Sequence, residues 1–271
     1  MSGKPYSNAL IHHTIHKIKS HWDEMRQSIQ PSDTHASQIE KWFSQISYLK
    51  QLSFHNSICI FFWDIVTNRF LFAIDEKKIT GYDLSLYVAK NGVDFSLANF
   101  HPDHIHALQL MNQCISECMR VHQQDTQIYK MIANIDASYR IADGSYLHML
   151  QQIVPVETDI NGIPVLFLSY VRDISHLKKQ MSASLVFTTP DICKLWNYNA
   201  DKREMEVIMP LTTQEKKIVQ MLGEGKQSRY IAEELSLSSH TVDTHRRRLL
   251  AKTNCLDTTA LSAYFQLIGL L

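Results

Sequence analysis

Apolar side chains recur at helical spacing in the first part of the chain. Between residues 8 and 29 one stripe recurs every three or four positions and predicts an amphipathic helix (Ile11, Ile15, Ile18, Trp22, Met25). Pro31 ends this helix, because proline has no backbone N–H to donate inside a helix. A second stripe predicts another helix (Ile39, Trp42, Phe43, Ile46, Leu49). Residues 1–56 are therefore expected to form a helical segment whose stripes pack either on a sheet or on a second subunit.

Residues 57–179 have mainly the pattern of strands. Aromatic and β-branched residues fill 58–64 and 69–73 on either side of a polar turn, as in a hairpin. A helical stretch follows, with a long helix that starts at Pro102 and carries apolar residues on one face. Three long strands come next (127–142, 145–157, 163–173). The turns between them, Asp143-Gly144 and Asn161-Gly162, favour tight hairpins, so the pattern predicts an antiparallel meander.

Residues 180–208 have neither the heptads of a long helix nor the composition of a flexible Gly/Ser tether. Residues 192–198 and 205–208 alternate like strands around a polar turn at 199–202. We expect a linker that forms a hairpin arm and joins the two flanking domains more rigidly than a tether would.

The last sixty or so residues predict four helices. Thr212 and Glu215 stand three apart, as in a capping box, and open the first of them, which Gly223 and Gly225 end. Ser228 is expected to cap the second helix and Ser238 the third. The fourth is too apolar for a solvated surface, so we expect it to cover the core or a partner subunit.

The third of these helices has two different sides. Val242, His245 and Leu249 fall at i, i+3 and i+7 and are expected to pack inward. The remaining side is polar and mostly cationic, and it is expected to face outward (His240, Asp243, Thr244, Arg247, Arg248).

Residues 209–271 resemble the LuxR-type helix-turn-helix family. The matching residues keep fixed offsets (Leu211-Thr212, Glu215, Gly225, Ile231-Ala232, Leu235-Ser236-Leu237-Ser238, Thr241-Val242, His245-Arg246, Lys252-Thr253-Asn254). The resemblance implies a four-helix domain that binds double-stranded DNA as a homodimer, with the third helix in the major groove. It places base-contacting side chains at Asp243, Thr244 and Arg247. It implies phosphate contacts from a second set (Ser228, Arg229, Thr241, His245, Arg248, Lys252).

Charge moderates this expectation. Asp243 stands where many members of the family carry Lys, which weakens general attraction to DNA at that point. From Leu211 onward, eight Lys or Arg oppose six Asp or Glu, an excess of only two. A modest, salt-sensitive affinity per monomer favours a dimer that contacts two half-sites about one helical turn apart. The alternative is that Ser228 and Ser238 only cap helices and that residues 246–248 form a solvated charged face.

Residues 57–179 resemble a PAS domain. Short fragments occur in the family's order and spacing (Trp63-Asp64, Gly81-Tyr82, His101-Pro102-Asp103, Tyr139-Arg140, Asp143-Gly144-Ser145-Tyr146, Gly162-Ile163-Pro164, Asp173-Ile174-Ser175). The resemblance implies a five-stranded sheet curled around a small pocket closed by helices, serving as the input domain. The chain lacks the Asn-Cys-Arg run of the flavin photosensors, and it carries His148 where many relatives carry Trp.

Five side chains are candidates for the pocket of this domain (Phe72, Met111, Cys114, Met131, Leu168). They either fill the core themselves or contact a small-molecule ligand. No cofactor is expected. A haem would need an axial ligand, but the histidines on or near the long helix (His104, His106, His122) are expected at the surface. Cys114 and Cys118, on an apolar helical face, are expected to be small core residues, so no metal site is predicted.

Composition narrows the class of protein. The 271 residues include 27 Lys or Arg and 27 Asp or Glu, so any attraction to nucleic acid must come from local patches. No apolar stretch is long enough to span a membrane, and the five cysteines form no CxxC pair. These features favour reduced thiols and a cytoplasmic location.

The sequence thus predicts an α+β protein that is a transcription regulator and not an enzyme. A PAS-like domain at 57–179 senses a signal or mediates dimerisation and controls a helix-turn-helix domain at 209–271. Two alternatives remain: an interaction module whose C-terminal domain does not bind DNA, and a redox sensor that carries a cofactor.

Overall fold

The computed structural model describes residues 8–121, 128–179, 182–190, 192–208 and 212–271. The chain opens with three helices, α1 (Asn8–Arg26), α2 (His35–Phe43) and α3 (Ile46–Asn56). Next come β1 (Cys59–Asp64), β2 (Arg69–Ile74), α4 (Ser85–Val88), α5 (Gly92–Ala98) and α6 (Ile105–Val121). Six strands follow: β3 (Ile132–Arg140), β4 (Tyr146–Thr158), β5 (Pro164–Asp173), β6 (Ser184–Thr188), β7 (Cys193–Asn199) and β8 (Glu204–Ile208). Four helices close the chain: α7 (Thr213–Gly223), α8 (Ser228–Glu234), α9 (Ser239–Thr253) and α10 (Thr258–Leu267). Short 3-10 turns lie at Pro102–His104, Ile128–Lys130 and Ser175–Leu177.

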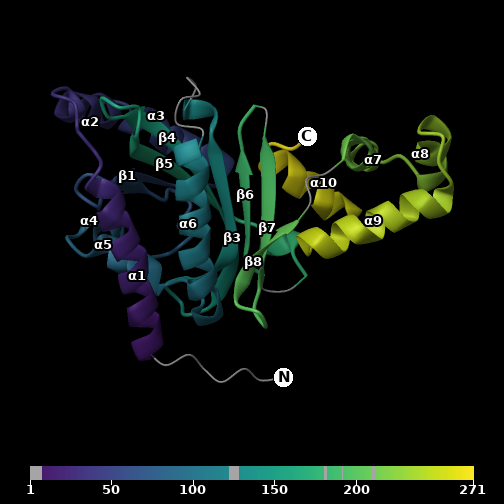
Figure 1. Cartoon of the computed structure of the whole chain (residues 1–271), viewed down its shortest axis with the longest axis horizontal. Helices are drawn as coiled ribbons and strands as arrows, with labels where there is room; N and C mark the ends of the chain where they lie inside the picture. Colours follow the sequence, from purple (N-terminus) through teal and green to yellow (C-terminus); the bar gives the residue numbers. More distant parts are fainter. Residues whose placement is uncertain (1–7, 122–127, 180–181, 191, 209–211) are drawn as a thin grey trace.

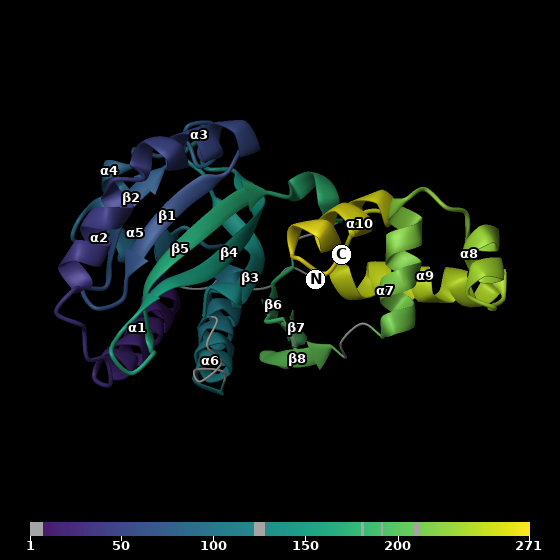
Figure 2. The ribbon, with the colours of Figure 1, turned by 90° about the horizontal axis from the view of Figure 1, so that it is seen from above.

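The described strands form a single antiparallel sheet in the order β2-β1-β5-β4-β3-β6-β7-β8. Its first five strands are the expected hairpin and meander, and they form the PAS-like sheet. The C-terminal helices lie beside the sheet, with α10 nearest to it and α8 farthest away (Figures 1 and 2). The predicted α+β class and the four C-terminal helices are confirmed.

Alternate side chains of β1 face two different helical layers, as the period of two in a strand requires. The ring centres of Phe61 and Tyr87 on α4 are 4.8 Å apart, and those of Trp63 and Trp22 on α1 are 4.9 Å apart. The residue between them, Phe62, lies 5.5 Å from Trp42 on α2. One face of the sheet therefore meets α1 and α4–α6, and the opposite face at this end meets α2 and α3. The second N-terminal helix, expected as one element, is two helices that meet at residues 44–45.

The segment 180–208 is part of the sheet. β7 and β8 form a hairpin where a hairpin arm was expected, and β6 joins them to β3. β3 would otherwise be an edge strand with unpaired N–H and C=O groups, and pairing with β6 satisfies them. Every residue of β6 is buried, because Leu185 and Phe187 belong to the core beneath α6 while Val186 belongs to the cluster beneath α10.

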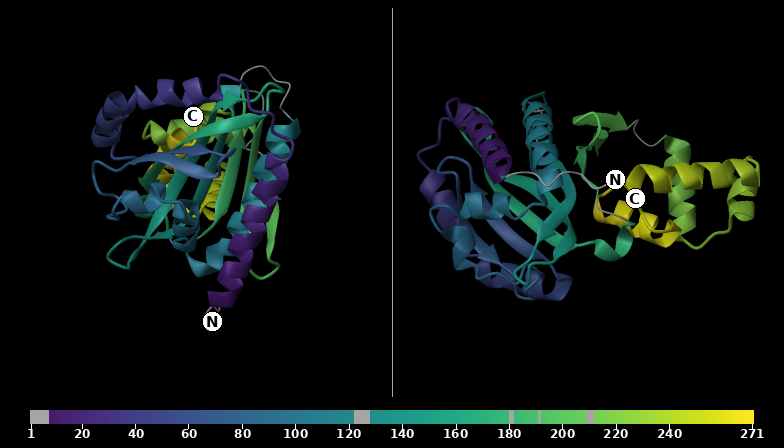
Figure 3. Two further views of the ribbon diagram at one scale, coloured as in Figure 1. Left: turned by 90° about the vertical axis from the view of Figure 1, so that its left-hand side faces the viewer. Right: turned by 90° about the horizontal axis from the view of Figure 1, so that it is seen from below.

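The C-terminal helices pack on the face of the sheet that α2 and α3 leave open. Buried residues of β4, β6 and β7 form one apolar cluster with α10 and the end of α9 (Leu150, Val186, Leu195, Leu249, Leu261, Tyr264, Phe265, Ile268). Figure 3 shows these helices extending away from the sheet on one side. The fourth C-terminal helix, α10, was expected to cover either the core or a partner subunit. In the structure it covers the core of its own chain.

The structure places one predicted surface histidine in the interior. His104 is buried, and its Nδ1 accepts a hydrogen bond from the backbone N–H of Ser138 on β3 at 3.0 Å. His106 is half-buried, with Nδ1 3.2 Å from the hydroxyl of Tyr198 on β7. These interactions join α6 and the 3-10 turn before it to strands far away in the sequence, so local spacing did not reveal them. His122 lies outside the described residues.

Candidate nucleic-acid interface

Local hydrogen bonds fix the starts of α7 and α9. The Thr212 hydroxyl accepts from the N–H of Glu215 at 3.1 Å, and the Glu215 carboxylate accepts from the N–H of Thr212 at 3.0 Å. This is the predicted capping box. Ser238 accepts from the N–H of Thr241 at 3.0 Å and so caps α9, also as predicted. These caps set the residues at which both helices begin.

The predicted cap of α8 is wrong. Gln227 is the N-cap residue and makes no side-chain cap bond. Ser228 lies inside the helix, and its hydroxyl donates instead to Oδ1 of Asp243 on α9 at 2.7 Å. The hydroxyl is taken by a charged acceptor on the neighbouring helix, and a hydrogen bond to a charged group is stronger than one to a backbone amide.

A small apolar cluster holds α7, α8 and α9 together. Its fully buried members are Ile218 from α7, Ile231 from α8 and Val242 from α9. Leu249, about two turns further along α9, is also buried, but in the cluster shared with α10 and the sheet. His245, expected on the same inward edge, is half-buried beside Glu215 of α7. The inward side of α9 is therefore the predicted one.

The outward side of α9 carries the side chains predicted to contact bases. Arg247 is exposed, whereas Asp243 and Thr244 are half-buried. Asp243 accepts from Ser228 and has an Arg246 nitrogen 3.5 Å from the same oxygen. Arg247 donates to the Thr244 hydroxyl at 3.4 Å. The three side chains share one face of the helix, and the guanidinium of Arg247 remains open to solvent.

The residues predicted to contact phosphates have different surroundings. Arg229 and Arg248 are exposed, and the Arg229 side chain, 87 % exposed, pairs with Glu233 on its own helix. His245 and Lys252 lie beside the carboxylate of Glu215, at 3.8 and 3.7 Å. Thr241 shares a 2.8 Å hydrogen bond with Ser238 at the start of α9. The structure thus brings Glu215 next to two predicted phosphate contacts, which sequence spacing did not show.

Glu215 is buried and has two roles. Burial alone would raise the pKa of its carboxyl, but the Thr212 hydrogen bonds and the Lys252 charge lower the pKa overall. Glu215 therefore stays anionic, caps α7, attracts the ammonium of Lys252 and lies beside the ring of His245. Arg246 is a further residue that the sequence analysis did not assign. Its spacing of i, i+3 from Asp243 is the signal for that contact.

The five predicted pocket residues do not converge on one cavity. Phe72 stacks on Phe62 of β1, and Leu168 on β5 is the strand partner of Phe62, so Phe72 and Leu168 both lie on the side of the sheet covered by α2. Met111 and Cys114 lie on α6, on the opposite side, and Met131 precedes β3. A small cavity beneath α6 has a volume of only about 70 Å³, and Trp22 and Trp63 are among the side chains that line it. The face of each strand residue depends on register, which the sequence pattern did not fix.

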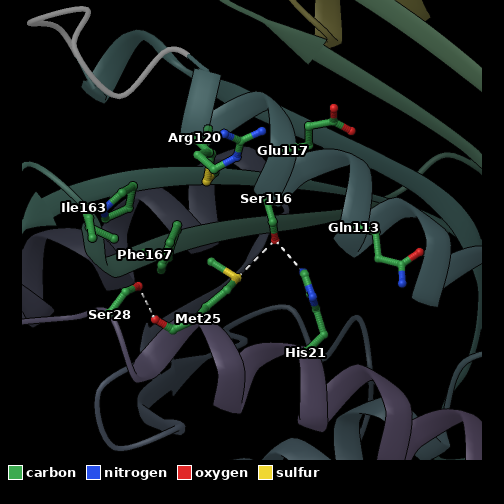
Figure 4. Close-up of a pocket in the computed structure, with 11 residues that line it drawn as sticks. His21, Met25, Ser28, Gln113, Ser116, Glu117, Arg120, Ile163 and Phe167 are labelled. Carbon is green, nitrogen blue, oxygen red and sulfur yellow. Dashed lines mark hydrogen bonds between the residues drawn. The ribbon is translucent and has the colours of Figure 1, made fainter.

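A larger cleft lies between α1 and α6, beside the start of β5 (Figure 4). Its volume is about 510 Å³, and its lining is mainly apolar, with Met25, Met119 and Phe167 among the residues. In its wall, Ser116 Oγ lies 2.9 Å from Nε2 of His21 and 3.1 Å from the sulfur of Met25. Figure 4 shows these three side chains turned toward one another between the two helices.

Metal and thiol chemistry find little support in the described residues. They contain no group of three His, Cys, Asp or Glu placed to hold a metal ion. Burial raises the pKa of all five cysteine thiols (Cys59, Cys114, Cys118, Cys193, Cys255). A raised pKa disfavours the thiolate that reacts with oxidants, so the redox-sensor alternative gains nothing from the structure. No helix in the described part of the chain has the length and apolar character needed to cross a bilayer.

Structures of VqmA are among the solved structures with partial likeness to the chain. The Vibrio cholerae VqmA dimer in the absence of target DNA is 17 % identical, with 84 % of this chain and 88 % of that one covered at a TM-score of 0.27. The Vibrio cholera VqmA–ligand–DNA complex is 15 % identical over the same shares, with a TM-score of 0.29. The phage VqmA–DPO complex is 13 % identical, covers 84 % and 90 %, and has a TM-score of 0.28. These scores are too low to support an argument about this chain. No curated protein matches it.

A family model identifies the C-terminal domain. Residues 209–265 match the model described as bacterial regulatory proteins, luxR family. The matched segment contains the capping box, the capped third helix and the exposed arginines of α9. The chain therefore carries the helix-turn-helix of the luxR family of bacterial regulatory proteins and is a DNA-binding regulator of that type.

Proposed function

We propose that the outward side of α9 enters the major groove of double-stranded DNA, with Asp243, Thr244 and Arg247 contacting base edges. One observation carries this proposal: Arg247 and Arg248 are exposed on the capped third helix, on the side away from the apolar cluster that holds α7, α8 and α9 together. Arg247 is suited to a forked pair with guanine O6 and N7. Asp243 keeps Oδ2 for a cytosine or adenine amine while Ser228 holds Oδ1.

Phosphate contacts on either side would orient the helix in the groove. Arg229 and Arg248 are exposed and ready for such contacts, with Thr241 near the start of α9. His245 and Lys252 would turn from Glu215 toward a phosphate, which carries the same sign of charge. Ser228 would serve as a phosphate donor only by giving up its bond to Asp243. The small cationic excess of the domain supports a homodimer that contacts two half-sites.

The DNA proposal is tested with two variants on a duplex selected from a random pool by the wild-type chain. Arg247→Ala should relax the base preference at one position, a loss of about 1–3 kcal/mol on the matched site. Lys252→Ala should weaken binding to every duplex alike and lower the salt slope by about one. Electrophoretic mobility shifts at several salt concentrations measure both. Equal losses for the two variants on matched and scrambled duplexes would contradict the assigned roles.

For the N-terminal domain, we propose control of the DNA-binding domain through a small apolar ligand in the cleft between α1 and α6. The cavity of about 70 Å³ beneath α6 is too small for such a molecule, whereas the cleft volume of about 510 Å³ lies within the usual range of ligand sites. Met25, Met119 and Phe167 would hold the apolar body of the ligand, and the His21–Ser116 pair would hold a polar group. Near its start, α6 contacts β7 through His106 and Tyr198, which gives a route toward the C-terminal domain.

The cleft is tested with 8-anilinonaphthalene-1-sulfonate, an aromatic anion whose fluorescence rises in apolar sites. Ser116→Phe should fill the cleft and abolish saturable binding of this probe. Ser20→Phe is the matched control, because Ser20 is exposed on α1 and does not line the cleft. Wild-type fluorescence that never saturates, or equal binding by the two variants, would contradict the assignment.

A further inference from the structure

The end of α9 is held by side chains from the sheet. The last four carbonyl groups of a helix have no partner within it and need donors from elsewhere. Lys178, which follows β5, donates from Nζ to the carbonyl of Thr253, the last residue of α9, at 2.9 Å. Asn197 on β7 donates from Nδ2 to the carbonyl of Lys252 at 2.7 Å. A cation at this end also complements the helix dipole.

Lys178 is itself fixed by a buried carboxylate. Asp136 on β3 has no exposed surface, and it pairs with Lys178 and with Nε2 of His148 on β4. The Ser184 hydroxyl on β6 donates to the same carboxylate at 3.3 Å. Burial alone would raise the pKa of Asp136, but Lys178 and His148 lower it to about 2. The charge of Asp136 is thus retained, and three strands of the sheet hold it in place.

The same lysine also contacts α10. Its Nζ lies 3.6 Å from the centre of the Tyr264 ring, and that ring is buried. Two backbone bonds flank it: the N–H of Leu256 donates to Leu177 O at 2.9 Å, and the N–H of Lys179 donates to Asn254 O at 3.0 Å. We call Asp136, His148, Lys178 and the carbonyl of Thr253 the interdomain cluster.

The interdomain cluster leaves the DNA-facing side of α9 uncovered. Arg247 and Arg248 are exposed while the helix end is held, and the start of α9 lies far from the sheet in Figure 1. The contact therefore fixes the orientation of the helix without blocking it. A buried ion pair also has strict geometric requirements, because a displaced partner leaves a buried charge unpaired.

We propose that Lys178 is a positioning residue for DNA binding: anchored by Asp136, it fixes the angle of α9 relative to the N-terminal domain. This inference rests on the proposed function, since it assigns how the sheet controls the DNA-binding helix. Small movements of β3, β4 or β6 would shift Asp136, and through Lys178 they would shift the end of α9. In a dimer, fixed helix angles set the spacing between the two half-sites that are bound together.

The contact itself is tested by hydrogen exchange on the full chain without DNA. Lys178→Met keeps most of the apolar stem and removes the ammonium. It should speed exchange of the Leu256 and Lys179 amides by about tenfold or more, while amides of β1 are unchanged. Lys179→Met is the matched control, because Lys179 is the exposed neighbour and its side chain is not in the cluster. Wild-type exchange in Lys178→Met would overturn the proposal.

A double variant distinguishes the effect of losing the bond from Lys178 to Thr253 from the effect of leaving Asp136 without its partner charge. Asp136→Asn with Lys178→Met removes both charges, so fast exchange that persists there reflects the lost bond to Thr253. Exchange restored to wild type would overturn the proposal. If Lys178→Met does not fold, Asn197→Ala removes the half-buried donor to Lys252 O and should speed exchange of the Leu256 amide. No change in that variant would again overturn the proposal.

The functional consequence is measured on a selected two-site duplex. Adding two base pairs between the half-sites should lower wild-type affinity about tenfold but Lys178→Met affinity about threefold or less. The ranking of single-base substitutions should be the same for both proteins, because Lys178 contacts no base. Equal penalties would refute a positioning role. If the wild type selects no duplex at all, the proposed function fails, while hydrogen exchange still decides whether Lys178 holds α9.

Discussion

At the scale of single residues, buried titratable groups carry the clearest physical signatures. His104 is buried beneath α6 with its Nδ1 accepting from a backbone N–H of β3. Burial lowers its pKa most, and together with the neighbouring His101 and His148 brings it to about 4. The ring is thus neutral in the folded protein near neutral pH, and the hydrogen bond from Ser138 requires that neutral form.

The folded protein should therefore lose stability as the pH falls. The unfolded state binds a proton on His104 near pH 6.5, whereas the folded state does so only near pH 4. Between these values the unfolded state holds more protons, so its free energy falls relative to the folded state. The contribution of His104 to the free energy of unfolding is fully present above pH 6.5, and about 3 kcal/mol of it is lost as the pH falls to 4.

Urea denaturation at several pH values between 7.5 and 4.5 measures this dependence. His104→Asn is the control, since its side-chain oxygen can accept from the Ser138 N–H but does not titrate. The variant should show a shallower fall in the free energy of unfolding. Parallel profiles for the two proteins would show that His104 is not the group responsible.

At the scale of elements, caps and turns decide where the DNA-binding helices begin. α7 has a complete capping box and α9 a serine cap, whereas α8 has no side-chain cap in the described structure. α8 is held instead by Ile231 in the small apolar cluster and by the bond from Ser228 to Asp243. The start of α9 matters most for function, because the residues that follow it face DNA.

Removing the α9 cap should weaken both stability and DNA binding. Ser238→Ala leaves the N–H of Thr241 without its acceptor and should cost about 1 kcal/mol of unfolding free energy. Ser239→Ala is the matched control, because Ser239 is the next residue and makes no cap bond. Urea denaturation and mobility shifts measure the two effects. A Ser239→Ala loss as large as that of Ser238→Ala would contradict the cap's role.

At the scale of the whole molecule, the sheet and the C-terminal helices share one buried interface. Tyr264 and Phe265 of α10 are almost completely buried in the cluster they form with β4, β6 and β7. Gln152 on β4 adds a hydrogen bond to the carbonyl of Leu267 at 2.9 Å. Because the two parts of the chain bury apolar surface against each other, neither should unfold at equilibrium while the other stays intact.

Wild-type unfolding should therefore be a single transition. The four tryptophans all precede residue 209, so their fluorescence reports the N-terminal part, while circular dichroism at 222 nm also follows the C-terminal helices. Phe265→Ala should cost about 3–5 kcal/mol and separate the two transitions. The exposed neighbour variant Gln266→Ala should leave them coincident. Coincident transitions in Phe265→Ala would show that coupling does not depend on this contact.

Many features of this structure could be predicted from local spacing in the sequence. The capping box at Thr212, the cap at Ser238 and the buried side of α9 were all predictable, because each depends on residues within one or two turns of a helix. The antiparallel meander followed from two turn signals. The LuxR-type class of the C-terminal domain was predicted from residues at fixed offsets, and the family model matches the same segment.

The tertiary structure alone decided which distant residues meet. The sequence determined the elements, their caps and the polar side of α9, because helical and strand periodicity are encoded locally. It did not place Phe72 and Leu168 on the face away from α6, because a shift of one residue in register reverses every side chain of a strand. Nor did it bring Lys178 to the end of α9, since that contact joins residues 75 positions apart through buried surface that forms only when the whole chain packs.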